Sequence, residues 1–251
     1  MGDLYTKPMA KASSLRRGLS PTIWSQASLT EISNGGLTEG FGFEDDFLSF
    51  TDTHGWVLTQ ATAGTVAPDA AAIGGAVLLD CNSTTNNQGV QIQYGGAVGA
   101  ASFIASASSK IYFEARVKIA DIGSTTCQLF AGLAIVDTSV LASAANSTAN
   151  HIGFEAINTT AMGIHSEKAG SRSSTAAVHT VVDDDYVKLG FVVDGLTKIT
   201  PYVNGVAKAA ITTNIPIVGM TPSFVCHSSG TTDPIVHVDW VACYQVEQIA
   251  N

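Results

Sequence analysis

Two stretches of the chain alternate apolar and polar residues one by one. They are Lys110–Ile119 (KIYFEARVKI) and Pro234–Gln245 (PIVHVDWVACYQ). In the first, every second residue from Ile111 is apolar, and in the second every second residue from Val236 is apolar. Successive side chains of a β-strand point to opposite faces, so a period of two is typical of half-buried strands. The chain is therefore predicted to be all-β.

Turn residues divide most of the remaining chain into short apolar segments, as in a β-sandwich. The predicted strands are Ala76–Cys81, Gly89–Tyr94, Ile111–Ile119, Leu129–Val136, Ile152–Ile157, Gly163–Lys168, Tyr186–Val193, Ile199–Val203, Thr221–His227 and Val236–Tyr244. The clearest local signal runs from Val187 to Ala207, where Asp194-Gly195 and Asn204-Gly205 are turn pairs. This segment is predicted to form three meandering strands.

Residues 1–43 show no sustained period of either kind, but they contain isolated large apolar residues. A disordered tail is poor in such residues, so we expect this arm to lie along its own domain or along a neighbouring subunit. Gly35, Gly36, Gly40 and Gly42 are predicted to form a hinge. The sandwich is then predicted to occupy residues 44–251, with Trp56 as an early core residue.

The chain is 45% hydrophobic and only 13% charged, which suits a large core. Its longest apolar runs, such as Leu129–Val136, are far too short to span a bilayer, and no signal segment opens the chain. We therefore expect neither membrane insertion nor export through the secretory pathway.

Charge is distributed unevenly. Residues 1–17 contain Lys7, Lys11, Arg16 and Arg17 against Asp3, a net +3, so the remaining residues carry −12 to give the total of −9. This basic arm either docks on an acidic protein surface or on nucleic acid, or is an ordinary solvated terminus. The acidic body would repel phosphate, so no nucleic-acid binding by the body is expected.

The four cysteines, Cys81, Cys127, Cys226 and Cys243, are widely spaced and lack a CxxC pair. They are predicted to be small buried thiols made at a reducing site. The six histidines are scattered, and Asp183–Asp185 is interpreted as a charged turn rather than a calcium site. No metal and no cofactor is predicted.

The sequence segments FEARVKI, LGFVVDG, YVNG and VDWVACYQ together resemble concanavalin A-like domains, the fold of legume lectins, laminin G modules and family 16 glucanases. The resemblance covers residues 44–245. It implies a concanavalin A-like jelly-roll β-sandwich, here with an extended N-terminal arm.

Family 16 glucanases depend on a strand that bears two glutamates with an aspartate between them, and this triplet is missing here. The corresponding region, Ile152–Asn158, offers only Glu155. Retaining glycoside hydrolysis needs two carboxyl groups, one as nucleophile and one as acid. Pairing of Glu155 with Glu114 or Glu167 has no support in the sequence, so Glu155 is interpreted as a solvated strand residue. The chain is predicted not to be an enzyme, and a glycoside hydrolase is the remote alternative.

A carbohydrate-binding module is the nearer alternative. Sugar binding without calcium needs an exposed aromatic platform. The candidate glycan-contact residues are Tyr94, Tyr112 and Tyr202.

The chain combines an acidic sandwich rich in glycine, alanine and threonine with a long arm that contains isolated apolar residues. In this it resembles structural proteins of tailed-phage virions, especially capsid decoration (cement) proteins. The resemblance implies a homo-oligomer that assembles in the host cytoplasm and binds the major capsid protein or other virion proteins at the capsid surface. The candidate partner-binding residues of the arm are Lys7, Lys11, Arg16, Arg17, Leu19, Ile23, Trp24 and Leu29.

Overall fold

The computed structural model describes residues 18–25, 38–50, 55–61, 64–95, 103–122, 127–140, 149–230 and 232–248. Within these ranges the chain is almost entirely β-structure, as the alternating pattern predicted. The elements are α2 (Pro21–Trp24), β1 (Thr38–Asp45), β2 (Trp56–Ala61), β3 (Thr65–Pro68), β4 (Val77–Asp80), β5 (Gly89–Tyr94), β6 (Ser109–Ala120), β7 (Cys127–Ala134), β8 (His151–Thr159), β9 (Ala161–Lys168), β10 (Ser171–Thr180), β11 (Tyr186–Asp194), β12 (Lys198–Val203), β13 (Val206–Ala207), β14 (Thr221–His227) and β15 (Ile235–Gln248).

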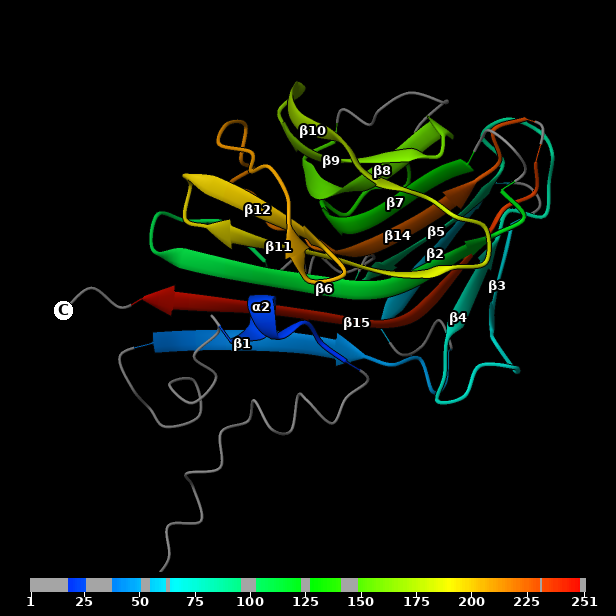
Figure 1. The fold of residues 1–251 in the computed structure, drawn as a ribbon, viewed down its shortest axis with the longest axis horizontal. Helices are drawn as coiled ribbons and strands as arrows, with labels where there is room; N and C mark the ends of the chain where they lie inside the picture. Colours follow the sequence, from blue (N-terminus) through cyan, green and yellow to red (C-terminus); the bar gives the residue numbers. More distant parts are fainter. Residues whose placement is uncertain are drawn as a thin grey trace, which may run out of the picture.

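The strands form two antiparallel sheets that pack face to face (Figure 1). Sheet A has the order β13-β12-β11-β6-β15-β4-β3, and β1 also pairs with β15, along the half of β15 that β4 leaves free. Sheet B has the order β10-β9-β8-β7-β14-β5-β2. Strands far apart in the sequence are neighbours in both sheets, which is the arrangement of a β-sandwich.

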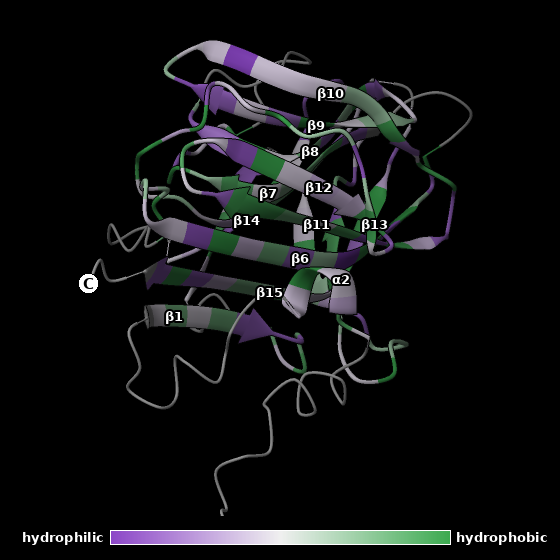
Figure 2. Cartoon of the chain, turned by 60° about the vertical axis from the view of Figure 1, so that its left-hand side comes forward, coloured by the Kyte–Doolittle hydropathy of each residue, from purple (hydrophilic) through white to green (hydrophobic). Residues whose placement is uncertain are grey.

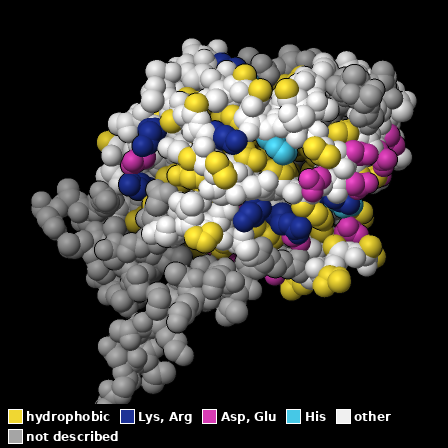
Figure 3. Space-filling view, in the orientation of Figure 1, with side chains coloured by type: hydrophobic (Ala, Val, Ile, Leu, Met, Phe, Trp, Pro, Cys, Tyr) yellow, Lys and Arg dark blue, Asp and Glu magenta, His cyan; other side chains and the backbone are white. Residues whose placement is uncertain are grey.

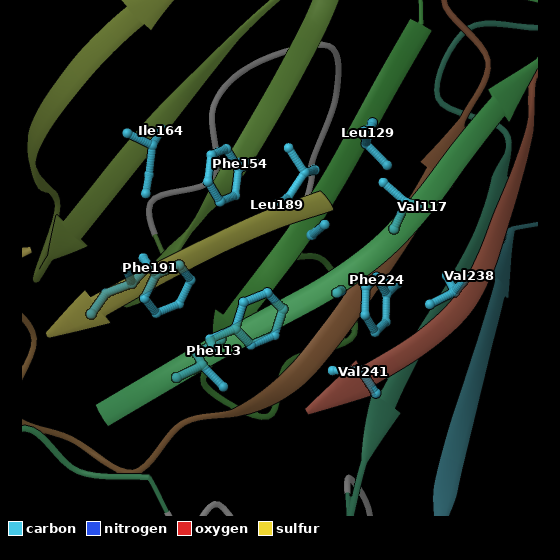
Figure 4. Close-up of a cluster of buried hydrophobic side chains, with 14 of the residues drawn as sticks. Phe113, Val117, Leu129, Phe154, Ile164, Leu189, Phe191, Phe224, Val238 and Val241 are labelled. Atoms are coloured by element: carbon cyan, nitrogen blue, oxygen red, sulfur yellow. The ribbon is translucent and has the colours of Figure 1, made fainter. Parts of the chain in front are cut away.

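The core lies between the sheets (Figure 4). Phe113 of β6 stacks on Phe191 of β11 with ring centroids 4.9 Å apart, and Phe154 of β8 approaches Phe191 from sheet B. Polar and apolar bands alternate along β6 (Figure 2), because one of its faces is buried in this core.

A β-bulge interrupts β15. Its register against β6 shifts between Val238 and Trp240, and an extra residue in a strand exchanges the faces of all residues beyond it. Val236 and Val238 therefore face the core before the bulge, whereas Val241 and Cys243 face it afterwards. The predicted single apolar row from Val236 to Tyr244 is wrong beyond the bulge, where Ala242 and Tyr244 lie on the outer face.

Each predicted strand lies on an observed one, and the segment from β11 to β13 is the predicted meander. The strands β1, β2, β3 and β10 were not predicted. The predicted hinge is wrong at Gly40 and Gly42, because both lie within β1, which pairs with β15. A Cβ atom on Gly42 would lie 2.0 Å from the ring of Tyr244. Glycine is therefore needed here for close packing. The predicted domain boundary at residue 44 falls inside β1.

Residues 18–25 cross the outer face of sheet A, where α2 lies over the sheet (Figure 1). Ile23 and Trp24 are buried against Tyr112, Val192 and Tyr202. This part of the arm thus lies along its own domain, one of the two arrangements expected from its apolar residues.

Three of the four cysteines, Cys81, Cys226 and Cys243, are buried, and the side chain of Cys127 is outside the described residues. The turn Asp183–Asp185 carries an ion pair, from Asp184 to Lys118. Among the described residues, no helix is long and apolar enough to cross a membrane.

His227, at the end of β14, is expected to make the protein sensitive to acid. Its Nδ1 atom is buried, without a hydrogen-bond partner among the described residues. Burial lowers the pKa of His227 from 6.5 to about 4. The unfolded chain then binds a proton at a higher pH than the folded chain does, so stability is lost as the pH falls from 6.5 towards 4.

The expected loss from this one side chain is on the order of 3 kcal/mol. Urea unfolding at several pH values measures it. The variant His227→Gln should show a flatter profile over this range, while His179→Gln, which removes a less buried histidine, should resemble the wild type more closely. An unchanged profile in His227→Gln would contradict the prediction.

Candidate functional site

The outer face of sheet B contains buried polar side chains, although it faces away from the core. On β8, Ile152 and Phe154 point into the core, so His151 and Glu155 point outwards. On β5, which β7 and β14 separate from β8, the side-chain amides of Gln91 and Gln93 donate to the carbonyl oxygens of Asp137 and Ile135, in the segment after β7. This segment partly covers the face, and the polar groups beneath it are hydrogen-bonded rather than solvated.

A histidine and a glutamate form a buried pair on β8. His151 Nε2 lies 2.6 Å from Glu155 Oε1, and the two side chains are 0% and 1% exposed. His151 Nδ1 lies 2.7 Å from the carbonyl oxygen of Ala149. Both ring nitrogens therefore face acceptors. The contact between Nε2 and Oε1 is an ion pair when the imidazole carries a proton on both nitrogens.

Arg172 of β10 connects this pair to a second carboxylate. Its guanidinium donates to Glu155 Oε2 and to Glu167 Oε2, each at 3.0 Å. It also donates to Nδ1 of His165 at 2.9 Å. Because arginine is only a donor, His165 accepts this bond at Nδ1 and carries its proton on Nε2. We refer to His151, Glu155, His165, Glu167 and Arg172 as the sheet B cluster.

The pKa values of two members of the cluster, Glu155 and His165, are shifted. Burial by itself would raise the pKa of Glu155, but the hydrogen bond from His151 and the positive charge around it lower the pKa below its ordinary value. Burial lowers the pKa of His165, although the charge of Glu155 opposes this effect. Glu155 is thus held ionised and His165 neutral near pH 7.

A hollow lies next to the cluster, where β10 bulges away from β9. The pairing of these strands shifts between Thr175 and His179, and Ala177 has a φ of 50°. The hollow has a volume of about 250 Å³ and is lined by Glu155, Ile157, Thr159, Ala161, Gly163, His165, Ala176 and Ala177. A Cβ on Gly163 would lie 2.9 Å from His165 Nε2. Glycine leaves room there for the imidazole.

The sheet B cluster is poorly suited to glycoside hydrolysis. A retaining mechanism needs one carboxylate free to attack and one carboxyl that is protonated. Both Glu155 and Glu167 instead bind the same guanidinium and are at most 3% exposed. Within the described part of the chain, no group of three His, Cys, Asp or Glu residues could hold a metal ion.

A second hollow, of about 400 Å³, lies on the outer face of sheet A. The guanidinium of Arg116 is 3.8 Å from the ring centre of Tyr186 and pairs with the buried Asp239. Lys118 and Asp69 also line this hollow. Basic and acidic side chains lie next to each other on the face shown in Figure 3. Each of these charged side chains has a partner, since Lys118 pairs with Asp184 and Asp69 with His237.

The three tyrosines predicted to contact glycan are buried or half-buried. Tyr112 is 2% exposed beneath Trp24, and Tyr202 is also buried. Burial, followed by the nearby Asp194 and Tyr202, raises the pKa of Tyr112 to about 12. Tyr94 is half-buried and packs against Phe43, with ring centroids 4.0 Å apart. The arm segment covers Tyr112 and Tyr202, and Phe43 of β1 packs on Tyr94, so the three rings form no exposed platform.

The candidate partner-binding residues are only partly described. Ile23 and Trp24 are buried on the chain's own sheet and Leu19 packs beside them, so in this structure they contact the sandwich itself. Lys7, Lys11, Arg16, Arg17 and Leu29 lie outside the described residues.

The sequence prediction missed most of the sheet B cluster. The interpretation of Glu155 as a solvated residue is wrong, and His151 is fully buried. The spacing of His151 and Glu155, four residues apart on one strand, places both on one face and was a usable signal. Arg172 gave no such signal. It lies in β10, whose serine, threonine and alanine residues are mostly exposed and show no alternation of apolar and polar residues.

The sequence matches no known protein-family model and no curated protein. Solved structures do resemble it. A protein of unknown function from Shewanella oneidensis MR-1 has a TM-score of 0.58 at 11% identity, over 84% of this chain and 89% of that one. Peanut lectin, solved with a nine-residue peptide, has a TM-score of 0.57 at 14% identity, over 82% of this chain and 97% of the lectin.

A family 16 glycoside hydrolase from Bacteroides ovatus, solved with the product G4G4G3G, has a TM-score of 0.52 at 13% identity, over 79% of this chain and 98% of the hydrolase. Lectins and hydrolases thus share this architecture, and at such low identity the likeness shows the fold and not the activity. With its two packed antiparallel sheets, the chain has the concanavalin A-like jelly-roll fold.

Proposed function

We propose that this chain is a non-enzymatic structural protein of a tailed-phage virion, a capsid decoration protein that binds the shell at its outer surface. The observation that carries the proposal is the docking of residues 18–25 on the outer face of sheet A. Lys188 Nζ donates to the carbonyl oxygen of Gly18 at 2.7 Å. Gly18, which directly follows the basic residues 1–17 in the sequence, is therefore held against the sandwich.

Charge supports the same function. Residues 1–17 carry a net +3, whereas the rest of the chain carries −12. An acidic body with a basic arm can approach an acidic shell protein only through the arm. Many weak arm contacts, linked to a folded domain, bind together far more strongly than each does alone. The partner would be the major capsid protein or a neighbouring virion protein, met in the host cytoplasm during assembly.

The absence of enzymatic activity is part of the proposal. It is supported by the sheet B cluster, in which Arg172 binds the carboxylates of both Glu155 and Glu167. Such a network is suited to stabilising the outer strands β8, β9 and β10.

Removal of the arm's charge should weaken capsid binding. The change is the replacement of Lys7, Lys11, Arg16 and Arg17 by glutamine, and the assay is co-sedimentation with naked capsids. We expect a loss of roughly tenfold or more in affinity, and a weakening of wild-type binding with added salt. The control replaces Lys168, Lys198 and Lys208 by glutamine and removes three positive charges from the sandwich, against four from the arm. Full capsid occupancy by the arm variant would contradict the proposal.

Carbohydrate binding is the second candidate, favoured by the hollow beside β10 and by the likeness to peanut lectin. In this case a glycan array should give a signal that Gly163→Val, which fills the hollow, removes. Binding on the glycan array, together with no co-sedimentation with capsids, would favour the second function over the first.

A further inference from the structure

The backbone of sheet B leaves a hollow between β9 and β10, which lie side by side with β8 (Figure 2). The pairing of β10 with β9 shifts between Thr175 and His179. Residues 176–178 of β10 therefore lie opposite Gly163 alone. Ala177, in this bulge, has a φ of 50°, a conformation that costs free energy in a residue other than glycine. Bulges and strained residues of this kind occur often at binding sites.

The walls of the hollow are mainly apolar. The side chains of Ile157, Ala161, Ala176 and Ala177 line it. Thr159 lines it too, but its Oγ1 atom already accepts a bond from the backbone N–H of Ala161 at 3.0 Å. The volume of about 250 Å³ equals that of about eight water molecules in the liquid. The hollow therefore has room for the apolar body of a small molecule, such as a single ring.

One hydrogen-bond donor faces this apolar space. Arg172 donates to Nδ1 of His165, so the proton of this imidazole is on Nε2. Nε2 lies over Gly163 at the hollow, since a Cβ at Gly163 would be 2.9 Å from it. Within the described part of the chain, no acceptor binds this Nε2–H. A ligand with an acceptor atom can therefore take a hydrogen bond from His165.

The charge beside the hollow selects among such ligands. Of the eight residues that line it, Glu155 is the charged one, because His165 is neutral near pH 7. The Glu155 side chain is 1% exposed, and its two oxygens already contact His151 and Arg172. Its negative charge would repel an anionic ligand. A cationic ligand would place its own N–H groups against the N–H of His165, so an uncharged acceptor fits best.

We infer that this hollow binds a small uncharged molecule with an apolar ring and one acceptor oxygen, such as an aryl ketone. The ring lies against Ile157 and the alanines, and the oxygen accepts from His165 Nε2. A sugar fits less well, because several of its hydroxyl groups would face alanine side chains without a hydrogen-bond partner. The inference does not rest on capsid binding, and its ligand class differs from the carbohydrate considered above.

Three small probes separate shape, hydrogen bonding and charge. Acetophenone has the ring and the acceptor, α-methylstyrene lacks the acceptor, and benzoate is an anion. In the full-length chain with isotopically labelled histidine, acetophenone should shift the Nε2 resonance of His165 in a saturable way. The other two probes should bind at least roughly fivefold more weakly, the effect of one hydrogen bond. Equal binding of all three probes, or no saturable binding of acetophenone, would overturn the inference.

A substitution at the rim locates the binding site. Ala176 is exposed and lines the hollow, so Ala176→Phe should fill it and lower the affinity for acetophenone roughly tenfold or more. The matched control, Ala67→Phe, places the same ring on an exposed position of β3 in the other sheet, and should bind as the wild type does. Urea unfolding checks that both variants fold.

The probe series on the wild-type chain does not depend on either variant. Unchanged affinity in a folded Ala176→Phe protein would overturn the inference. So would a glycan-array signal that Ala176→Phe removes, if acetophenone does not bind, because the hollow would then be a carbohydrate site.

Discussion

Replacement of Arg172 by methionine should lower the free energy of unfolding by about 3–5 kcal/mol, the range for breaking a buried ion pair from one side. Arg172 is the cation between Glu155 and Glu167, and both carboxylates are at most 3% exposed. Methionine has a similar size but no charge, so it removes the cation without leaving a large cavity. Equilibrium unfolding in urea measures the change.

A triple variant separates charge from packing. Adding Glu155→Gln and Glu167→Gln to Arg172→Met removes the two carboxylate charges that the first substitution leaves without a cation. Most of the lost stability should therefore return. His151 should tolerate a glutamine in place of Glu155, because its Nδ1–H still donates to Ala149 and the new amide can donate to Nε2. If Arg172→Met loses less than about 1 kcal/mol, as exposed ion pairs do, the network does not hold the outer strands of sheet B.

Replacement of Trp24 by alanine should release the arm segment from sheet A. The indole is buried between Tyr112 and Tyr244 and donates to Glu114. Removal of a buried tryptophan costs about 3–5 kcal/mol. Because the segment can leave the sheet while the sandwich stays folded, the observed loss is limited to the free energy of docking.

Tyrosine titration reports this release directly. Burial, ahead of the charges of Asp194 and Tyr202, raises the pKa of Tyr112 to about 12. In Trp24→Ala the phenol becomes solvated, so its pKa should fall towards its ordinary value of 10.0, as ultraviolet titration of the tyrosines would show. Trp24→Phe keeps a ring over Tyr112 and should lower this pKa less. An unchanged titration in Trp24→Ala would mean that the segment does not cover the tyrosine.

The two predictions concern surfaces that a sandwich of this kind leaves outside its core. On sheet A the outer face is covered by the chain's own segment, around the buried Glu114. On sheet B it is occupied by ion pairs and by the backbone of the segment after β7. Both outer faces thus hold polar groups that need specific partners, and those partners come from distant parts of the sequence.

The strands themselves could be read from the sequence. In β6 and β11 every second residue is apolar, and this period of two requires a strand with one buried face. The pair Asn204-Gly205 has the positive φ values, 50° and 76°, that tight hairpin turns need. These signals are local, because they depend only on the geometry of a single strand or turn.

What lies opposite each strand was decided by the tertiary structure. Alternation shows which face Glu155 occupies, but not that Arg172 from β10 lies over it, because pairing between strands depends on contacts far apart in the chain. The same limit applies to Trp24 and Glu114, which are 90 positions apart, and to the bulge at Asp239, which exchanges the faces of β15. The sequence by itself determined an all-β sandwich and most of its strands. Only the tertiary structure decided which polar groups meet on its two outer faces. Burial on these faces depends on segments that are distant in the sequence, and the alternation of apolar and polar residues does not reveal them.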